Sequence, residues 1–111
     1  MASAEEIAWA AGLFDGEGSI THSDRDLQLS LRNTDLELVE RFHRILDRGA
    51  AYGPYEHRAR DGFNRKPFWV WVAHGDAGHT ALELLAPWLS ARRRAQALEH
   101  GVVLPTQNVE T

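Results

Sequence analysis

The fold is decided by the stretch Ala10-Ala11-Gly12-Leu13-Phe14-Asp15-Gly16-Glu17-Gly18. Upstream of it, Ser3 and Glu6 have the three-residue spacing of a capping box, which predicts a short helix from Ile7 to Phe14. Small residues on this helix would allow another backbone to approach closely. The run 15–18 is predicted to end the helix, because its two glycines can adopt a positive φ.

Strand and helix patterns alternate beyond this stretch. Residues 27–33 place leucines and polar residues on opposite faces, which predicts a half-buried strand after a short strand at 19–23. Thr34 and Glu37 form a second capping-box pattern and predict a helix to about Asp47.

The second half of the chain is predicted to add two strands and two helices. Tyr52-Gly53-Pro54 is expected to be a loop into a strand over 55–60, and residues 61–64 have a hairpin-turn pattern. Residues 68–72, Phe-Trp-Val-Trp-Val, form the strongest strand pattern. Asp76 and Ser90 are expected to cap the last two helices.

The predicted order is therefore α-β-β-α-β-β-α-α, an α+β fold with a four-stranded antiparallel sheet and helices on one face. The other face of the sheet would be open, polar and partly aromatic. Residues 1–104 are expected to form a single domain, followed by a polar C-terminal tail at 105–111.

Composition excludes several classes of protein. The chain has 111 residues, 43% of them hydrophobic, and no cysteine, so a disulfide framework and a cysteine zinc site are both excluded. No apolar run approaches the roughly 20 residues that span a bilayer. The N-terminus has acids where a signal peptide has basic residues, so a soluble cytoplasmic protein without a membrane partner is expected. The sequence has no glycine-rich phosphate-binding loop before a predicted helix, so no small-molecule cofactor is expected.

The net charge of −4 argues mildly against a nucleic-acid partner. The charge distribution weakens that argument, because residues 1–18 contain four acids and no base. Residues 49–75 contain four bases, Arg58, Arg60, Arg65 and Lys66, against two acids. A protein that is acidic overall can therefore still present a basic face.

Asp15 and Glu17 are the leading candidates for chemistry. Two carboxylates two residues apart stand at the end of the predicted helix, where main-chain carbonyls such as that of Gly16 add oxygen ligands. Mg²⁺ prefers one or two carboxylates together with waters and substrate phosphate oxygens. A metal held in this way can polarise a phosphate and activate water.

The run Ala-Gly-Leu-Phe-Asp-Gly-Glu-Gly-Ser resembles the signature of the LAGLIDADG homing endonuclease family, with Ala10 as the weak match. The Leu-Ser-Leu strand, Asn33-Thr34-Asp35 before a helix, and Ala86-Pro87-Trp88-Leu89 before a basic helix also resemble the family's plan. The resemblance covers roughly residues 4–104. It implies a site-specific, metal-dependent DNA endonuclease that hydrolyses phosphodiester bonds and serves intron or intein mobility.

The resemblance also implies how the site is built. Glu17 would bind the catalytic divalent metal, expected to be Mg²⁺, and Arg92 would stabilise the phosphate transition state. Asp35 falls where the family often places a polar residue that positions water, and His74 is expected to approach the site. A single signature implies a homodimer on a roughly palindromic double-stranded DNA site. The expected dimer interface is Ala8, Ala11, Gly12 and Asp15, the last as a supporting residue.

The open sheet face would read DNA, because a β-ribbon can enter the major groove. The two tryptophans of the strongest strand share one face, opposite the Phe-Val-Val face, and are assigned to the DNA side. There they would contact deoxyribose and methyl groups or cover the sheet beside the turn. The expected DNA-binding residues are Thr21, Ser23, Gln28, Ser30, Arg32, Arg58, Arg60, Arg65, Trp69 and Trp71.

Three functions compete on the sequence alone. The first is the DNA endonuclease, favoured by the intact Glu17 and by Arg92. The second is a LAGLIDADG-fold protein that binds DNA as a regulator or assists RNA splicing as a maturase without cutting. The third is an interaction module unrelated to nucleic acids, favoured by the acidic net charge.

Overall fold

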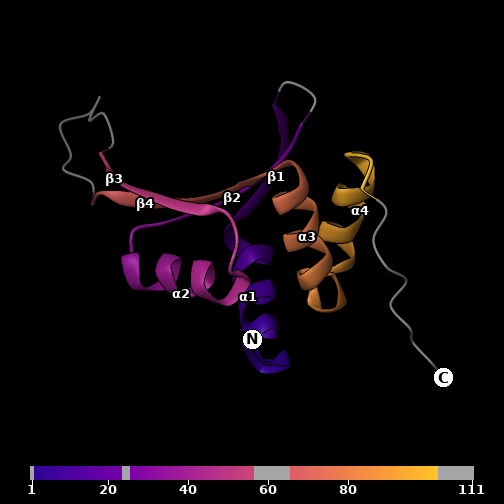
Figure 1. Ribbon diagram of the computed structural model, residues 1–111, viewed down its shortest axis with the longest axis horizontal. Helices are drawn as coiled ribbons and strands as arrows, with labels where there is room; N and C mark the ends of the chain where they lie inside the picture. The colour runs from indigo at the N-terminus through magenta and orange to yellow at the C-terminus, as the bar shows by residue number, and fades with distance from the viewer. Residues whose placement is uncertain (1, 24–25, 57–65, 103–111) are drawn as a thin grey trace.

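A four-stranded antiparallel sheet forms the centre of the computed structural model, with helices gathered on one side and the other side uncovered (Figure 1). The structure describes residues 2–23, 26–56 and 66–102. The elements are α1 (Ala4–Glu17), β1 (Gly18–Ser23), β2 (Asp26–Asn33), α2 (Leu36–Leu46), β3 (Ala50–Tyr55), β4 (Phe68–His74), α3 (Gly75–Leu85), a 3₁₀ turn η1 (Ala86–Trp88) and α4 (Ala91–Glu99). This order confirms the predicted α+β architecture.

The strand order β1-β2-β4-β3 puts the two strongest strands in the middle of the sheet. Leu31 pairs with Trp71, and Leu29 with Ala73, so these four side chains share the face that the helices cover. Trp71 is fully buried, meets the Phe42 ring of α2 edge-on at 4.8 Å, and donates its indole N–H to the carbonyl of Arg48 at 2.9 Å. The core therefore lies between this face and the helices.

The first helix has the predicted capping box, but it begins at Ala4, three residues before the predicted start, and it ends later. Ser3 and Glu6 form the expected capping box, with backbone N–H to side-chain distances of 2.9 and 3.1 Å. Helix α1 continues past Phe14 to Glu17, and Gly18 follows in an extended conformation with φ −81°, not a positive φ. Gly18 is needed for space, because a Cβ at this position would collide with the Phe14 ring.

The second and third helices are capped by residues other than those predicted. Asp35, not Thr34, caps α2, and its Oδ1 accepts the N–H of Glu37 at 3.0 Å. His74 occupies the N-cap position of α3 without a side-chain hydrogen bond, so the predicted cap at Asp76 is wrong. The predicted cap of α4 is confirmed, because the Ser90 hydroxyl accepts the N–H of Arg93 at 3.2 Å.

The third strand differs most from the prediction. Tyr52-Gly53-Pro54, expected as a loop, lies inside β3. Proline is tolerated there because β3 is an edge strand that pairs only with β4, and an irregularity separates the pairs made by Tyr52 and Tyr55. Most of the predicted strand at 55–60 and the turn at 61–64 lie outside the described residues, as does the tail at 105–111.

No helix in the described ranges combines the length and the apolar character that a membrane crossing requires.

Candidate metal centre and nucleic-acid interface

Asp15 joins the end of α1 to the start of α4. Its carboxylate accepts the N–H of Ser90 at 3.1 and 3.2 Å and the Ser90 hydroxyl at 3.0 Å. The carboxylate thus lies at the N-terminus of α4, where the helix dipole favours a negative charge. The Asp15 carboxylate therefore makes these hydrogen bonds within its own chain, which agrees with the expectation that it supports the site and does not bind the metal itself.

Arg93 is the functional residue that the sequence reasoning missed. The residue is only 6% exposed, and its guanidinium donates to the carbonyls of Asp15 at 3.1 Å and Gly18 at 2.8 Å, and to Gln96 Oε1 at 2.7 Å. Burial lowers the pKa of Arg93, the neighbouring Arg92 lowers it further, and Asp15 opposes the shift. Arginine nevertheless keeps its charge at neutral pH. Arg93 therefore holds a positive charge beneath the α1–β1 junction.

A sequence signal for Arg93 existed. Leu89, Arg93 and Ala97 are four residues apart, and all three are buried. Residues with this spacing share one face of a helix, so the apolar neighbours on either side mark Arg93 as the inward-facing member of the arginine run.

Arg92 is exposed and reaches the same junction from outside. Its guanidinium donates to the Asp15 carbonyl at 3.2 Å, which places a positive charge two residues from Glu17 along the chain. Arg92 therefore has the exposure and position that a phosphate contact beside Glu17 requires.

Glu17 is the exposed final residue of α1. The last turn of this fully described helix contains no basic residue, and a helix C-terminus carries a partial negative charge. The Glu17 carboxylate and the C-terminal end of α1 therefore both favour the binding of a cation. Glu17 lines a groove of about 270 Å³ with Arg32, Asn33, Thr34 and Phe68, at the edge where β2 ends and β4 begins.

Glu17 could supply some of the oxygen ligands of an Mg²⁺ site, with waters and substrate phosphates supplying the others. Within the described ranges, no cluster of three or more His, Cys, Asp or Glu side chains could hold a metal. Mg²⁺ is typically bound through one or two carboxylates plus waters and substrate phosphates, so a single exposed Glu17 supplies a partial but chemically suitable set. The carbonyls of Asp15 and Gly18 already accept from arginines. A contribution from Gly16 stays a prediction.

Asp35 and His74, the two remaining predicted site residues, lie in different parts of the structure. Asp35 follows the groove residues Asn33 and Thr34, and its main-chain N–H donates to Asn33 Oδ1 at 2.8 Å. His74 pairs across the sheet with Gln28, and their side chains meet at 3.2 Å. Gln28 lies three residues before Leu31, which pairs with Gly18 beside Glu17, so His74 lies roughly 10 Å along the sheet from the level of Gly18. The expected approach of His74 to the site stays a prediction.

The open face of the sheet carries the predicted polar residues. Thr21 pairs with Gln28, and Ser30 and Arg32 pair with Val72 and Val70, so these six side chains share the uncovered face. Ser23 ends β1, but the placement of its side chain lies outside what the structure describes. Arg58, Arg60 and Arg65 also lie outside the described residues.

The assignment of Trp69 and Trp71 to the open face is wrong. Trp71 is fully buried in the core, and Trp69 is half-buried against it. The alternation along β4 is as predicted, but the register with β2 turns the tryptophans inward and leaves Phe68, Val70 and Val72 outward.

The small residues of α1 are not equivalent. Ala11 is fully buried in its own chain, so the expectation that it contacts a second subunit is wrong. Ala8 is half-buried, and Gly12 is exposed, with no atom within 4 Å of where a Cβ would stand. Gly12 is therefore a point in the middle of α1 with room for another backbone, as is Gly16 near its end.

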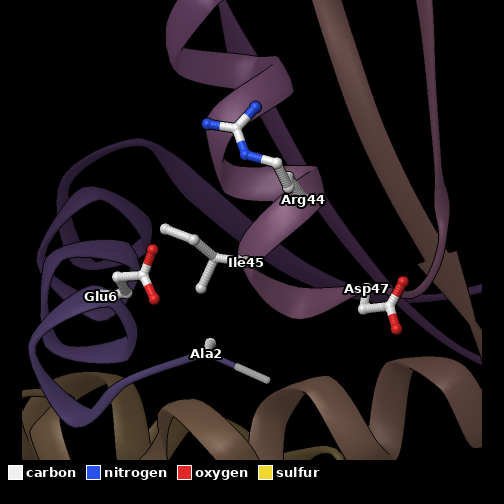
Figure 2. A pocket seen from close by; sticks show the side chains of 5 residues that line it. All are labelled: Ala2, Glu6, Arg44, Ile45 and Asp47. Atoms are coloured by element: carbon white, nitrogen blue, oxygen red, sulfur yellow. The ribbon is translucent and has the colours of Figure 1, made fainter.

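A second pocket, of about 220 Å³, lies at the other end of α1 (Figure 2). Ala2, Glu6, Arg44, Ile45 and Asp47 line it. Its charged groups do not converge, since Arg44 and Asp47 point away from each other in Figure 2. Glu6 stands eleven residues before Glu17, about 16 Å along the helix, so this pocket is separate from the metal-binding end.

A family profile described as "LAGLIDADG-like domain" matches residues 4–68 of the chain. No curated protein matches it.

Similar solved structures include two of the homing endonuclease I-CvuI. One, in complex with its target in the presence of Ca, is 21% identical, with a TM-score of 0.60. The other, with the I-CreI target in the presence of Mg, is 22% identical, with a TM-score of 0.58. Each match covers 87% of this chain and 64% of that one.

A third similar structure is that of I-CeuI, a group I intron-encoded homing endonuclease complexed with DNA. It is 12% identical, with a TM-score of 0.57, and the match covers 91% of this chain and 54% of that one. The chain thus spans less than two thirds of the length of all three proteins, and at these identities the likeness shows a shared fold.

Proposed function

Because this chain belongs to the LAGLIDADG-like domain family, we propose that it is one subunit of a site-specific homing endonuclease that cuts double-stranded DNA. The observation that carries the proposal is the exposed Glu17 at the C-terminal end of α1, with Arg92 hydrogen-bonded to the Asp15 carbonyl of the same helix end. A cation-attracting carboxylate and a phosphate-attracting guanidinium at one helix end are the parts that phosphodiester hydrolysis needs.

Glu17 would hold Mg²⁺ or another divalent cation, with the Gly16 carbonyl as a further ligand. When bound, the cation polarises the scissile phosphate and lowers the pKa of a bound water. The protein's own contribution is positioning. Arg92 offers its guanidinium to the phosphate, while Asp15 and Arg93 fix the α1–β1 junction so that Glu17 projects from a rigid helix end. Asp35, next to the groove, would orient water through its second carboxylate oxygen.

We propose a homodimer through α1, because the chain has one copy of the signature. Gly12 and Ala8 would form the contact, and two Glu17 side chains would then lie close to the symmetry axis. Two neighbouring carboxylates repel each other, and divalent cations between them offset that repulsion. The DNA site would be roughly palindromic for the same reason.

The open sheet face would read the DNA bases. Gln pairs well with adenine and Arg with guanine, and Ser and Thr pair with either. The described candidates are Thr21, Gln28, Ser30 and Arg32, with Ser23, Arg58, Arg60 and Arg65 as further predicted contacts.

A non-cutting nucleic-acid-binding protein, either a DNA-binding regulator or an RNA maturase, is the second candidate. One observation favours it: the carbonyls of Asp15 and Gly18 are occupied by arginines, which leaves Glu17 as the principal anionic ligand in each chain. Such a site would bind a cation weakly until a substrate phosphate completes it.

The two candidates are separated by incubating the protein with a randomised palindromic DNA library in Mg²⁺. An endonuclease releases a defined set of cut sequences, whereas a regulator retains sequences uncut. A protein that neither cuts nor retains any sequence would contradict both the endonuclease and the DNA-binding regulator, and would leave the RNA maturase.

A further inference from the structure

The open face of the sheet has an apolar half in which Arg32 is the one predicted DNA contact among the described residues. Five apolar or aromatic side chains and one arginine enclose a shallow hollow of about 280 Å³ there. We call this set the aromatic patch: Tyr52, Tyr55, Phe68, Val70 and Val72, with Arg32.

The patch is exposed and ordered by its own contacts. Tyr52 and Tyr55 are 52% and 45% exposed, which is unusual for large side chains on a small domain. The rings of Tyr55 and Phe68 lie 5.6 Å apart, and the Arg32 guanidinium lies over the Phe68 ring at 4.5 Å. These groups stand on three neighbouring strands, Arg32 on β2, the tyrosines on β3 and Phe68 on β4.

The other half of the same face is polar. Thr21, Gln28 and Ser30 stand on β1 and β2, and the Gln28 amide meets the His74 ring at 3.2 Å. Hydrogen-bonding groups of this kind read the donors and acceptors of base edges. The outer face is therefore divided into a hydrogen-bonding half and an apolar half.

The patch adjoins the groove of Glu17. Arg32 and Phe68 line both the groove and the patch, so the two hollows are continuous. Among the described residues, Arg32 is the charged side chain that lines the patch, while Lys66, just before β4, and Glu56, just after β3, are both exposed. A positive side chain in an apolar hollow, next to the proposed phosphate-binding end, fits an occupant that presents both phosphates and apolar groups.

The thymine methyl is the apolar group that the four bases present in the major groove. We propose that the aromatic patch recognises thymine 5-methyl groups at the base pairs next to the phosphate bound at Glu17. This inference rests on the proposed DNA-binding function and adds a specificity to it. The aromatic patch would recognise thymines near the cleavage point, and the polar half of the face would form hydrogen bonds with base pairs farther out. Val70 and Val72 would form the floor that receives the methyl, and the tyrosines its wall.

The test measures binding to the duplex recovered from the library, with Ca²⁺ in place of Mg²⁺ so that binding is measured without cutting. Each thymine is replaced in turn by deoxyuridine, which lacks only the 5-methyl group. Burial of one methyl-sized group corresponds to about a fourfold change in affinity. The parent protein is expected to lose about fourfold at one or more thymines nearest the cleavage point.

Two variants of one half-buried position serve as a matched pair. Val70→Thr keeps the shape of the side chain but adds a hydroxyl, and it is expected to bind thymine and deoxyuridine duplexes within about twofold of each other. Val70→Ile keeps an apolar surface and the thymine preference. Thermal unfolding of both variants checks that each is folded.

The inference is overturned if deoxyuridine weakens binding nowhere, or weakens Val70→Thr as much as the parent. In either case the protein still binds DNA, so the proposed function stands. Failure to recover any DNA from the library would instead overturn the proposed function, and this inference with it.

Discussion

The Asp15 carboxylate accepts hydrogen bonds from both the main-chain N–H and the hydroxyl of Ser90. This contact gives the two acids of the signature different roles. Asp15 joins α1 to α4, whereas Glu17, two residues later, is left exposed at the helix end. The fold therefore uses the Asp15 carboxylate for structure and leaves the Glu17 carboxylate exposed, where the proposed cation would bind.

Asp15→Asn should lower the free energy of unfolding by about 1–2 kcal/mol, because hydrogen bonds to a charged acceptor are lost. Ser90→Ala should cost a similar amount, and the double variant less than the sum of both. Urea denaturation measures all three. Glu17→Gln is the control and should change stability by less than about 0.5 kcal/mol. Equal stability of Asp15→Asn and the parent would remove Asp15 from its structural role.

Arg93→Met should destabilise the protein by about 1–3 kcal/mol, since it removes the arginine that donates to the Gly18 carbonyl and one of the two arginines that donate to the Asp15 carbonyl. Arg92→Met is the matched variant at the exposed neighbour, and it should change stability by less than about 0.5 kcal/mol. On the recovered DNA site, Arg92→Met should slow cleavage about a hundredfold. If the stability losses of the two variants were reversed, the assignment of the two arginines would be wrong.

Gly18→Ala should destabilise the protein by about 1–3 kcal/mol, because the added Cβ would collide with the Phe14 ring. Gly16→Ala is the control two residues earlier, inside α1, where no atom stands within 4 Å of the new Cβ. It should be neutral or stabilising by up to about 1 kcal/mol. Thermal denaturation of both variants is sufficient, and equal effects would contradict the packing described at this junction.

Gly12→Ala tests the proposed dimer. Within one chain the new methyl meets nothing, so the helix should become more stable by about 0.5–1 kcal/mol. If α1 packs closely against a second α1, the same methyl should weaken self-association. Sedimentation velocity at several protein concentrations measures this directly. A parent protein that stays monomeric at micromolar concentration, or a Gly12→Ala variant that associates as tightly, would argue against the α1 interface.

The N-terminus of α1 should depend on pH through Glu6. A hydrogen bond from the Ser3 main-chain N–H lowers the pKa of Glu6 below its ordinary value of 4.5. A lowered carboxylate pKa stabilises the fold above the ordinary pKa, and that contribution is lost as the pH falls through the folded value. Amide exchange at residues 5–7 should therefore speed up below about pH 4.5 relative to the rest of α1. Glu6→Gln should abolish this pH dependence, and its persistence would exclude Glu6 as the cause.

The sequence predicted correctly those helices and strands whose capping residues or hydrophobic alternation fit a single structure. The leucine alternation of β2 fixed its buried face, and the capping residues Ser3 and Ser90 marked two helix starts. Alternation along β4 was equally clear, but both of its faces are apolar. Only the pairing of Leu31 with Trp71 shows which face enters the core, and that register depends on contacts distant in sequence.

The remaining differences have similar causes. Gly53 and Pro54 are turn formers, and their place in β3 follows from its edge position, which local sequence does not reveal. Within the site, Glu17 was identified from the signature, whereas the hydrogen bonds of Arg93 to the α1–β1 junction depend on how α4 packs against α1. Local propensity does not determine that docking.

The central claim is that Glu17 holds the catalytic cation of a DNA-cutting site. The most direct test is single-turnover cleavage of the recovered duplex in Mg²⁺ by the parent and by Glu17→Gln, with DNA affinity measured for both in Ca²⁺. The account predicts that Glu17→Gln binds within about threefold of the parent and cuts at least about a thousandfold more slowly. Cleavage by Glu17→Gln at the rate of the parent would contradict it.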